Sequence, residues 1–400
     1  GRVISSEQQK IAEKTRKLVD KYIGSYKRLE QQNEQQDLEA SERKRISRII
    51  SRGIQVQWVK GDADKAEHSF FKINTQGTPL DPIEELLLQN RNKPIPISAR
   101  AVIRAGTGHK YWSNFKDENK TMIVEYSKKF HKILFEPELQ RPIKTLDLPL
   151  GGSKGVRDAI QILIDLMLIS NRNQKGIPKL VSDQADDLTG EDTISSLKKS
   201  LKLISRISGN DGGSLGLHPA VYFYGPSGRH SRSMFLGIAT LIAQKLANND
   251  SNFFVKFTKA REKLEKILVS RKDLIATILQ KHLSRKRNMI YAKLIDELVK
   301  LISKGVDVMD SKIVEITELE GKIVVGDHIS TGSEFDDDAK SKTFLDKALE
   351  SAIKCPICSG YLDPEKSISY DHIVRQRENG KGNAENCQLT HPFCNQSIKN

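Results

Sequence analysis

The stretch CPICSGYLDPEKSISYDHIV, residues 355–374, and the last eighteen residues, NAENCQLTHPFCNQSIKN, contain all four cysteines of the 400-residue chain. Cys355 and Cys358 form a C-x-x-C pair, and His391 and Cys394 form an H-x-x-C pair. Together the two pairs supply three thiolates and one imidazole, a ligand set that holds zinc in a closed tetrahedral site. The sequence therefore predicts a structural zinc site that stabilises the C-terminal residues.

A second set of polar residues lies between and just beyond these pairs. Asp371 and His372 are adjacent, Asn386 precedes the second pair, and Asn395 follows it directly. A histidine is mostly neutral at pH 7 and can act as a general base. Carboxylate and amide oxygens suit Mg²⁺ or Mn²⁺ better than zinc. Hydrolysis of a phosphodiester needs these two components, because it requires an activated water and a cation beside the phosphate.

The order C-x-x-C, D-H-I, Asn and then H-x-x-C, whose last residue opens C-N-x-x-x-K, resembles HNH endonucleases of the ββα-metal class. The resemblance covers about the last 50 of the 400 residues. It departs from the family in the H-x-x-C pair, where C-x-x-C is commoner, and in one extra residue after Asn395. It implies Mg²⁺- or Mn²⁺-dependent cleavage of DNA, with His372 as the base and Asp371 and Asn395 as metal ligands. It also implies that Asn386 steadies the loop that carries the base, a role for which Asn383 competes.

Two other interpretations of these residues remain open. The zinc site could be purely structural, with Asp371 and His372 in an ordinary turn, and the module would then be a non-catalytic, zinc-stabilised DNA-binding adaptor. Cys387 is interpreted as a small buried apolar residue. It could instead replace His391 in a site of four cysteines.

Composition favours a soluble, mainly helical protein with small β elements (α+β). Hydrophobic residues make up 37% of the chain and charged residues 29%, and 400 residues suggest two or three domains. The longest apolar run, near residues 160–169, contains Gln161 and Asp165 and is too short to span a membrane. No signal peptide is recognisable, and cysteines confined to one metal-type cluster favour the cytoplasm. The chain begins at Gly1 within a helical pattern, which suggests that a further segment precedes it.

The first 145 residues are expected to form a partial ParB/sulfiredoxin-like domain. Helical patterns over residues 6–50 precede an alternating strand signal at 54–59. The pattern F-x-x-N-x-x-G-x-x-L at 71–80 then resembles the second signature of that domain in GmrSD-type restriction enzymes, where an HNH module often follows. The upstream D-G-x-x-R signature is missing, and the residues alone favour a structural turn at Gly77.

This second resemblance implies a bacterial restriction or anti-phage setting, with NTP as a further ligand. It leaves open a homo-oligomer or a partner protein of a defence system. It also leaves an alternative function, in which the chain is an NTPase regulator that acts through its N-terminal domain.

The rest of the chain is divided by its breaks and charge into further segments. These are a helical domain with a basic helix at 146–318, a linker or hairpin at 319–343, and the zinc-containing module at 344–400 with a first helix at 344–353. A strand is predicted at 220–224, before a loop whose Arg229, His230 and Arg232 could contact phosphate at a helix start.

The formal net charge of +14 favours a polyanionic partner, and DNA is the partner expected here. Residues 355–400 hold five basic and five acidic side chains, so the surplus lies upstream. Residues 256–293 hold twelve basic side chains against three acidic ones in a helical pattern, which predicts an amphipathic helix that binds DNA through Arg285, Lys286 and Arg287. The alternatives are a solvated helix face here, or a DNA contact at 43–52.

Overall fold

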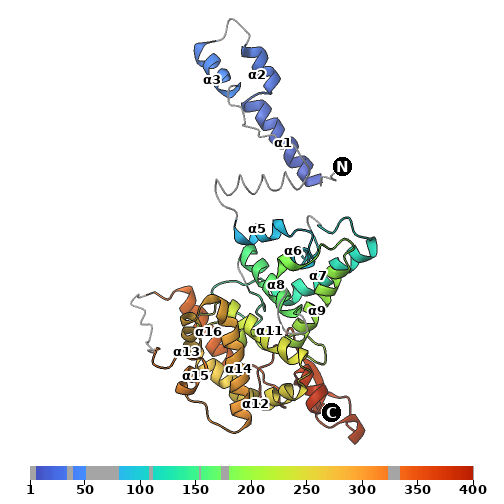
Figure 1. Cartoon of the computed structure of the whole chain (residues 1–400), viewed down its shortest axis with the longest axis vertical. Coiled ribbons are helices and arrows are strands. Elements are labelled where there is room, and N and C mark those ends of the chain that lie inside the picture. The colour runs from blue at the N-terminus through green and yellow to red at the C-terminus, as the bar shows by residue number, and fades with distance from the viewer. Residues whose placement is uncertain are drawn as a thin grey trace. The chain divides into compact units, whose positions relative to one another are not determined.

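The computed structural model describes residues 6–33, 39–50, 81–107, 111–152, 155–172, 180–322 and 334–399. The chain forms two compact units, Gly1–Leu80 and Asp81–Asn400, and each is considered by itself. Helices dominate the described residues of both units (Figure 1). The described strands form a single two-stranded antiparallel sheet. The expectation of a mainly helical protein with small β elements is confirmed.

The first unit contains three described helices, α1 (Ser6–Tyr22), α2 (Tyr26–Asn33) and α3 (Ala40–Ile50). Helices α2 and α3 pack together, and Leu29 and Ile46 are buried. The strand signal at 54–59 and the signature at 71–80 lie outside the described residues. The ParB/sulfiredoxin-like domain therefore stays a prediction.

The described residues of the second unit begin with five α-helices: α5 (Pro82–Gln89), α6 (Pro94–Ile103), α7 (Asp117–Phe135), α8 (Val156–Ser170) and α9 (Glu191–Ile207). Helix α5 starts at Pro82, where Asp81 accepts a hydrogen bond from the Ile83 N–H and the proline occupies the first turn. Helix α6 packs against α7, α8 and α9, and nine of its ten residues are buried. This almost wholly buried helix forms the centre of the first half of the core.

The second half of this unit contains α10 (Pro219–Tyr222), α11 (Arg232–Ala247), α12 (Ser251–Ser270), α13 (Lys272–Lys281), α14 (Arg287–Ser303), α15 (Asp310–Ile316) and α16 (Asp337–Glu350). Helix α11 is central, because nine consecutive residues from Met234 to Ile242 are buried. A side chain at Gly237 would place its Cβ 2.9 Å from the backbone oxygen of Asn288 and from the Cβ of Tyr291. This glycine therefore allows α11 and α14 to approach closely.

The predicted strand at 220–224 is wrong. The segment forms the helical turn α10, in which Pro219 occupies the first turn and the His218 side chain accepts a hydrogen bond from the Ala220 N–H. The Lys272 ammonium group donates to the carbonyls of Ala220, Val221 and Tyr224 at the other end of the turn. A short apolar and aromatic run fits a buried helical turn as well as a strand, and here the capping residues favour the turn.

The expected single basic helix at 256–293 is also wrong. Residues of α12, α13, the 3₁₀ turn η2 (Ser284–Lys286) and the start of α14 share this range. Two cations in this range contact other parts of the protein instead of facing solvent. Arg261 is buried beside Glu265, and Lys272 is half-buried against the α10 carbonyls. Burial lowers the pKa of Lys272 to about 8. The charge surplus of the sequence therefore overstates the positive surface of this segment.

The last helix before the cysteines starts earlier than expected, at Asp337 rather than at residue 344. The Asp336 side chain accepts a hydrogen bond from the Ala339 N–H, and two further aspartates occupy the first turn. The aspartates that were assigned to a linker therefore form a helix start, where carboxylates are favourable. Helix α16 ends at Glu350.

The C-terminal residues form a small antiparallel pair, β1 (Ser369–His372) and β2 (Cys387–Thr390), followed by a short π-helix, η5 (Cys394–Ile398). In Figure 1 they are the red ribbon next to the C label. One cluster of buried apolar side chains extends from Leu87 to Leu349 and also includes Phe393. Phe393 thus joins the C-terminal residues to the core of the helical body, while Cys355, Cys358, Leu362 and Cys394 form a separate small cluster. The proposed boundaries within residues 81–400 remain predictions.

Candidate metal centre and adjoining pocket

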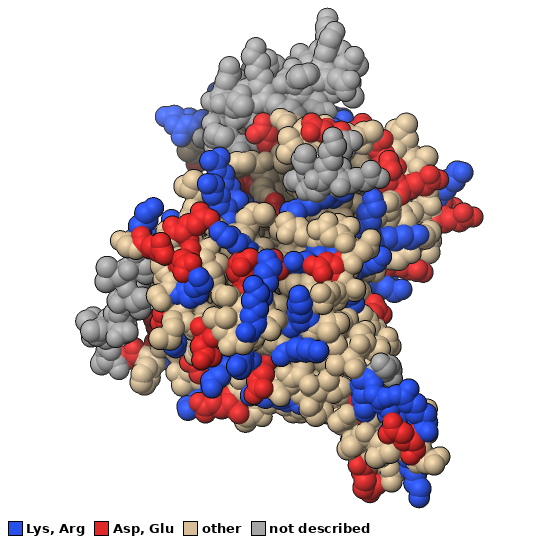
Figure 2. All heavy atoms as spheres, turned by 60° about the horizontal axis from the view of Figure 1, so that its bottom comes forward, with Lys and Arg blue, Asp and Glu red and all other residues tan. Residues whose placement is uncertain are grey.

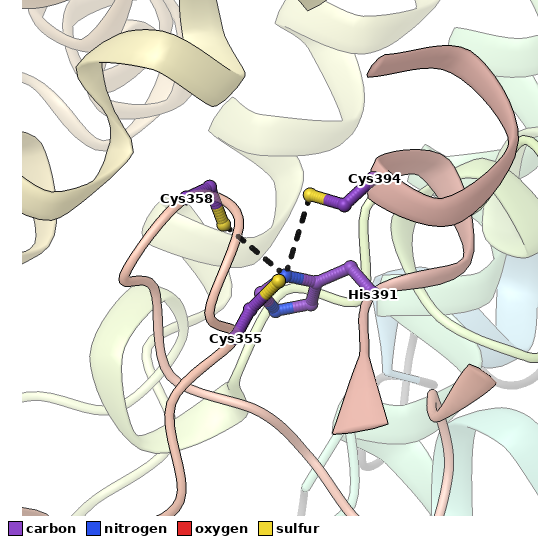
Figure 3. Close-up of side chains that lie close together, drawn as sticks. All are labelled: Cys355, Cys358, His391 and Cys394. Atoms are coloured by element: carbon purple, nitrogen blue, oxygen red, sulfur yellow. Dashed lines mark hydrogen bonds between the residues drawn. The ribbon is translucent and has the colours of Figure 1, made fainter. Parts of the chain in front are cut away.

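The four predicted zinc ligands form one buried cluster. One ligand atom from each of Cys355, Cys358, His391 and Cys394 lies within 4.8 Å of the other three. The Nδ1 atom of His391 is 3.3 Å from the Cys358 sulfur and 3.8 Å from the Cys394 sulfur (Figure 3). Usual zinc–sulfur and zinc–nitrogen bond lengths place such atoms about 3.6 Å apart around a tetrahedral ion. The donor set and its spacing therefore fit zinc.

The two halves of the cluster come from two local turns. A backbone hydrogen bond of 2.8 Å from the Ser359 N–H to the Cys355 carbonyl closes a tight turn that contains Cys358. His391 directly follows β2, and Cys394 is the first residue of η5. The prediction that His391 rather than Cys387 belongs to the cluster is confirmed.

The histidine is held in a defined orientation. Its Nε2 lies 2.9 Å from the carbonyl oxygen of Tyr361, so Nε2–H is the donor and Nδ1 is left to face the sulfurs. Burial lowers the pKa of His391, which favours the neutral ring that binds metals. Hydrogen bonds from the neighbouring thiols lower the pKa of Cys355, while the hydrogen bond with Cys355 and burial raise the pKa of Cys358 to about 12. Because three thiolates within 4.8 Å of one another repel, the cluster needs a bound cation to hold all three cysteines in the charged form.

A buried ion pair of the helical body supports the cluster from outside. The Nε of Arg261 is 2.7 Å from a carboxylate oxygen of Glu265, and both side chains are 2% exposed. The other oxygen of Glu265 accepts a hydrogen bond from the Tyr361 N–H at 2.7 Å. A Cβ at Gly360 would collide with Arg261, so only glycine fits there. Tyr361 thus links α12 to His391 through its N–H and its carbonyl.

The two-stranded sheet positions the second set of polar residues. Asp371 pairs with Gln388 across the strands, and His372 pairs with Cys387. Because side chains alternate along a strand, the carboxylate of Asp371 is buried while the next residue is more exposed. One oxygen of Asp371 accepts hydrogen bonds of 2.8 Å from the Gln388 amide and from the Lys399 ammonium group.

A pocket of 320 Å³ adjoins this sheet. It is lined by Asp371, His372, Asn383, Asn386 and Cys387, among others. The imidazole of His372 has no hydrogen-bond partner among the described residues, so nothing there occupies its nitrogens. The pocket therefore places a free imidazole beside a buried carboxylate.

Asn386 holds the loop between the strands. Its side-chain oxygen accepts a hydrogen bond of 2.6 Å from the Val374 N–H, and its amide nitrogen donates to the carbonyls of Val374 and Lys381. These bonds close the segment that follows His372. Asn383 makes no side-chain hydrogen bond with the described residues, although it lines the same pocket.

Asn395 lies next to β1 but not in the pocket lining. Its amide nitrogen donates to the Ser369 hydroxyl at 2.7 Å and to the Tyr370 carbonyl at 3.3 Å. The side-chain oxygen of Asn395 has no hydrogen bond to the described residues. Its amide nitrogen contacts Tyr370, the residue directly before Asp371 in β1. Two oxygen donors fit Mg²⁺ in kind, but the Lys399 ammonium group already contacts Asp371. A catalytic Mg²⁺ or Mn²⁺ site stays a prediction.

Cys387 differs from its expected environment, since it is exposed rather than buried. It is the first residue of β2 and lines the 320 Å³ pocket. Cys355, Cys358 and Cys394 are buried in the cluster.

One thiol per chain is therefore expected to react rapidly with a disulfide reagent such as dithionitrobenzoate in the native protein. After denaturation with a chelator, four should react. Mass spectrometry should place the rapid label on Cys387. Rapid labelling of two or more thiols in the native, metal-loaded protein would contradict the cluster.

The anion-binding residues proposed from sequence have partners within the protein. Arg229 forms an ion pair with Asp338 at 3.1 Å, and Arg232 pairs with Asp165. The His230 Nε2 lies 2.7 Å from the Leu150 carbonyl oxygen. The phosphate contact proposed for this loop remains untested.

The predicted DNA-binding residues lie at the turn before α14. Arg285 and Lys286 are exposed in η2, while Arg287 is half-buried and donates to the carbonyls of His282 and Gln280. Arg285 and Lys286 are therefore exposed to solvent, whereas Arg287 also contacts the protein backbone. Their contact with DNA stays a prediction.

Sequence reasoning missed the residues that support the site. Lys399 ends the C-N-x-x-x-K motif but was given no role, and Gln388 becomes visible only from the strand register. Arg261 and Glu265 are four positions apart on α12, a spacing typical of an ion pair on a helix surface, whereas here the pair is buried and contacts Tyr361. A contact between segments this distant has no local sequence signal.

No protein-family model matches the chain, and comparisons with characterised proteins and with solved structures find no match. In the part of the chain that the structure describes, the helices are all too short or too polar to cross a bilayer.

Proposed function

We propose that the C-terminal module is a zinc-supported, metal-dependent endonuclease that hydrolyses DNA phosphodiester bonds. The observation that carries the proposal is the 320 Å³ pocket that contains both Asp371 and His372, on a hairpin that leads directly into the zinc cluster. It is supported by the resemblance to HNH endonucleases of the ββα-metal class. The zinc has four protein ligands and no open position for substrate, so its role is structural.

In the proposed reaction, His372 takes the proton of a water molecule that attacks the phosphorus atom. The bond from phosphorus to the leaving oxygen then breaks, and that oxygen is protonated from solvent. Asp371 and the carbonyl of Asn395 would hold a divalent cation, which supplies charge neutralisation at the phosphate. Lys399 would have to give up its contact with Asp371 or share it, because both cations need the same carboxylate.

DNA is the proposed substrate because of the net charge of +14. The module itself is charge-neutral, so the helical body would supply most of the phosphate contacts. Figure 2 shows blue and red side chains interspersed on the visible face rather than separated into one continuous basic track. Binding would therefore use several short basic patches. A restriction or anti-phage setting, and a defence-system partner, are proposals that rest on resemblance alone.

One observation favours a second candidate, a non-catalytic DNA-binding adaptor. The buried carboxylate of Asp371 is already satisfied by Lys399 and Gln388, which is the arrangement of a structural aspartate. The adaptor would keep the zinc cluster and the DNA contact and would have no need of a free imidazole at His372.

Chelation separates the two candidates. Brief treatment with EDTA should abolish plasmid nicking, and added Mg²⁺ should restore it while zinc remains bound, because oxygen ligands hold metals more loosely than thiolates. Zinc retention would be measured by mass spectrometry of the intact protein. Nicking that persists in EDTA would count against the proposed metal requirement, and binding without any nicking would favour the adaptor.

A further inference from the structure

A second pocket lies away from the nuclease site, between α8, α11 and the start of α14. It has a volume of 660 Å³, within the range of sites for small ligands. Four arginines line it, namely Arg172, Arg232, Arg285 and Arg287, against one carboxylate, Asp165. The lining therefore carries a formal surplus of three positive charges.

Two of these arginines are unpaired within the described chain. Arg285 makes no hydrogen bond or ion pair there, and the buried Nε of Arg172 has no hydrogen-bond partner there. A buried guanidinium N–H without a partner is costly, so its presence in a pocket indicates a missing acceptor. Arg232 and Arg287 are anchored instead, by Asp165 and by the His282 and Gln280 carbonyls respectively. The pocket thus combines two oriented arginines with two that are available.

The remaining lining specifies the ligand further. Ser233 in the first turn of α11 and Asn288 in the first turn of α14 both line the pocket. These helices are 16 and 17 residues long, and their N-terminal ends favour anions. Leu168, Leu180 and Leu236 supply an apolar wall. Such a lining suits phosphate groups attached to an apolar or planar body.

We propose that this pocket binds a small ligand that carries several phosphate groups. Arginine is suited to this because its planar fork binds phosphate oxygens in pairs. A duplex backbone would need an extended track, whereas four arginines here line one open pocket. The site unites two regions that appear in the sequence as separate basic stretches, the loop before α11 and the turn before α14. It does not depend on the nuclease proposal and uses none of the residues around Asp371 and His372, although Arg285 and Arg287 are also predicted DNA contacts.

The test is calorimetric titration of the full chain with ATP, with inorganic tripolyphosphate and with a 20-base-pair duplex, at fixed salt. The double variant Arg172→Ala/Arg285→Ala removes the two unpaired arginines without breaking an internal contact. It should weaken binding of ATP and tripolyphosphate by about 100-fold, since each charge-assisted hydrogen bond contributes about tenfold or more. Tighter binding of ATP than of tripolyphosphate would show that the apolar wall contributes.

The matched control is Lys281→Ala/Lys304→Ala, which removes two exposed cations outside the pocket and changes net charge equally. It should alter ATP affinity by less than about twofold, because the removed charges are screened by solvent. Failure of both small ligands to bind at millimolar concentration would overturn the proposal. So would equal weakening by both double variants, or an effect of Arg172→Ala/Arg285→Ala on duplex binding alone.

Discussion

Replacing His372 with alanine is expected to lower the rate of DNA cleavage by roughly 10²–10⁴-fold, the range that a general base contributes. The imidazole bonds to no described residue, so its removal should leave zinc content, melting temperature and DNA affinity near those of the wild type. The measurement is a single-turnover nicking assay, with a binding assay on the same preparations. Unchanged cleavage would remove His372 from the mechanism.

The loop asparagines provide a matched pair for this experiment. Asn386→Ala breaks the hydrogen bonds to Val374 and Lys381 and should slow cleavage by misplacing the segment that follows His372. Asn383→Ala removes a pocket side chain without a described hydrogen bond and should slow cleavage less. The reverse order would show that Asn383, the competing candidate, fixes the loop.

Replacing Cys394 with serine is expected to abolish stable zinc binding and to lower the melting temperature of the second unit by about 10 °C. Zinc binding energy is also folding energy. Several lost kilocalories per mole translate into a shift of that size. The effect should spread beyond the C-terminal residues, because Tyr361 connects His391 to the buried Arg261–Glu265 pair and Phe393 belongs to the main core. The zinc-bearing module is therefore not expected to unfold alone.

Cys387→Ser is the control for that substitution. It makes the same chemical change at an exposed cysteine outside the cluster and should keep one zinc per chain with an unchanged melting temperature. Zinc content and thermal unfolding would be measured in parallel. Zinc loss in Cys387→Ser, or full zinc retention in Cys394→Ser, would refute the assignment of ligands.

The zinc ligands were predictable because the constraint is local. Two residues three positions apart can meet one ion only in a tight turn, and the spacing of C-x-x-C and H-x-x-C records that turn. The start of α5 was predictable for the same kind of reason, since Asp81 and Pro82 carry the signal of a helix N-terminus themselves.

The errors occurred where tertiary contacts decide. The run at 220–224 forms a helical turn, and Cys387 is exposed at the start of β2. Burial of Arg261 reduces the positive surface charge of the basic segment at 256–293, because a cation that was counted as surface charge is part of the core. The exposure of Cys387 and the burial of Arg261 have no signal within a few residues of these positions, whereas the capping residues His218 and Pro219 directly precede the helical turn.

The two candidate sites differ in the same way. Asp371 and His372 were identified from adjacent residues, whereas the arginine-lined pocket brings together residues from four segments of the second unit. The arginines meet in one pocket because of how α8, α11 and α14 pack. In the sequence they contribute only to the net positive charge.

The most direct test of the central claim is incubation of supercoiled plasmid with the zinc-loaded wild-type chain in Mg²⁺. The protein should carry one zinc per chain, verified on the same sample. The account predicts conversion to nicked or linear DNA, which stops when Mg²⁺ is withheld. Intact plasmid in the presence of Mg²⁺ or Mn²⁺, from a folded protein that binds DNA and retains its zinc, would contradict it.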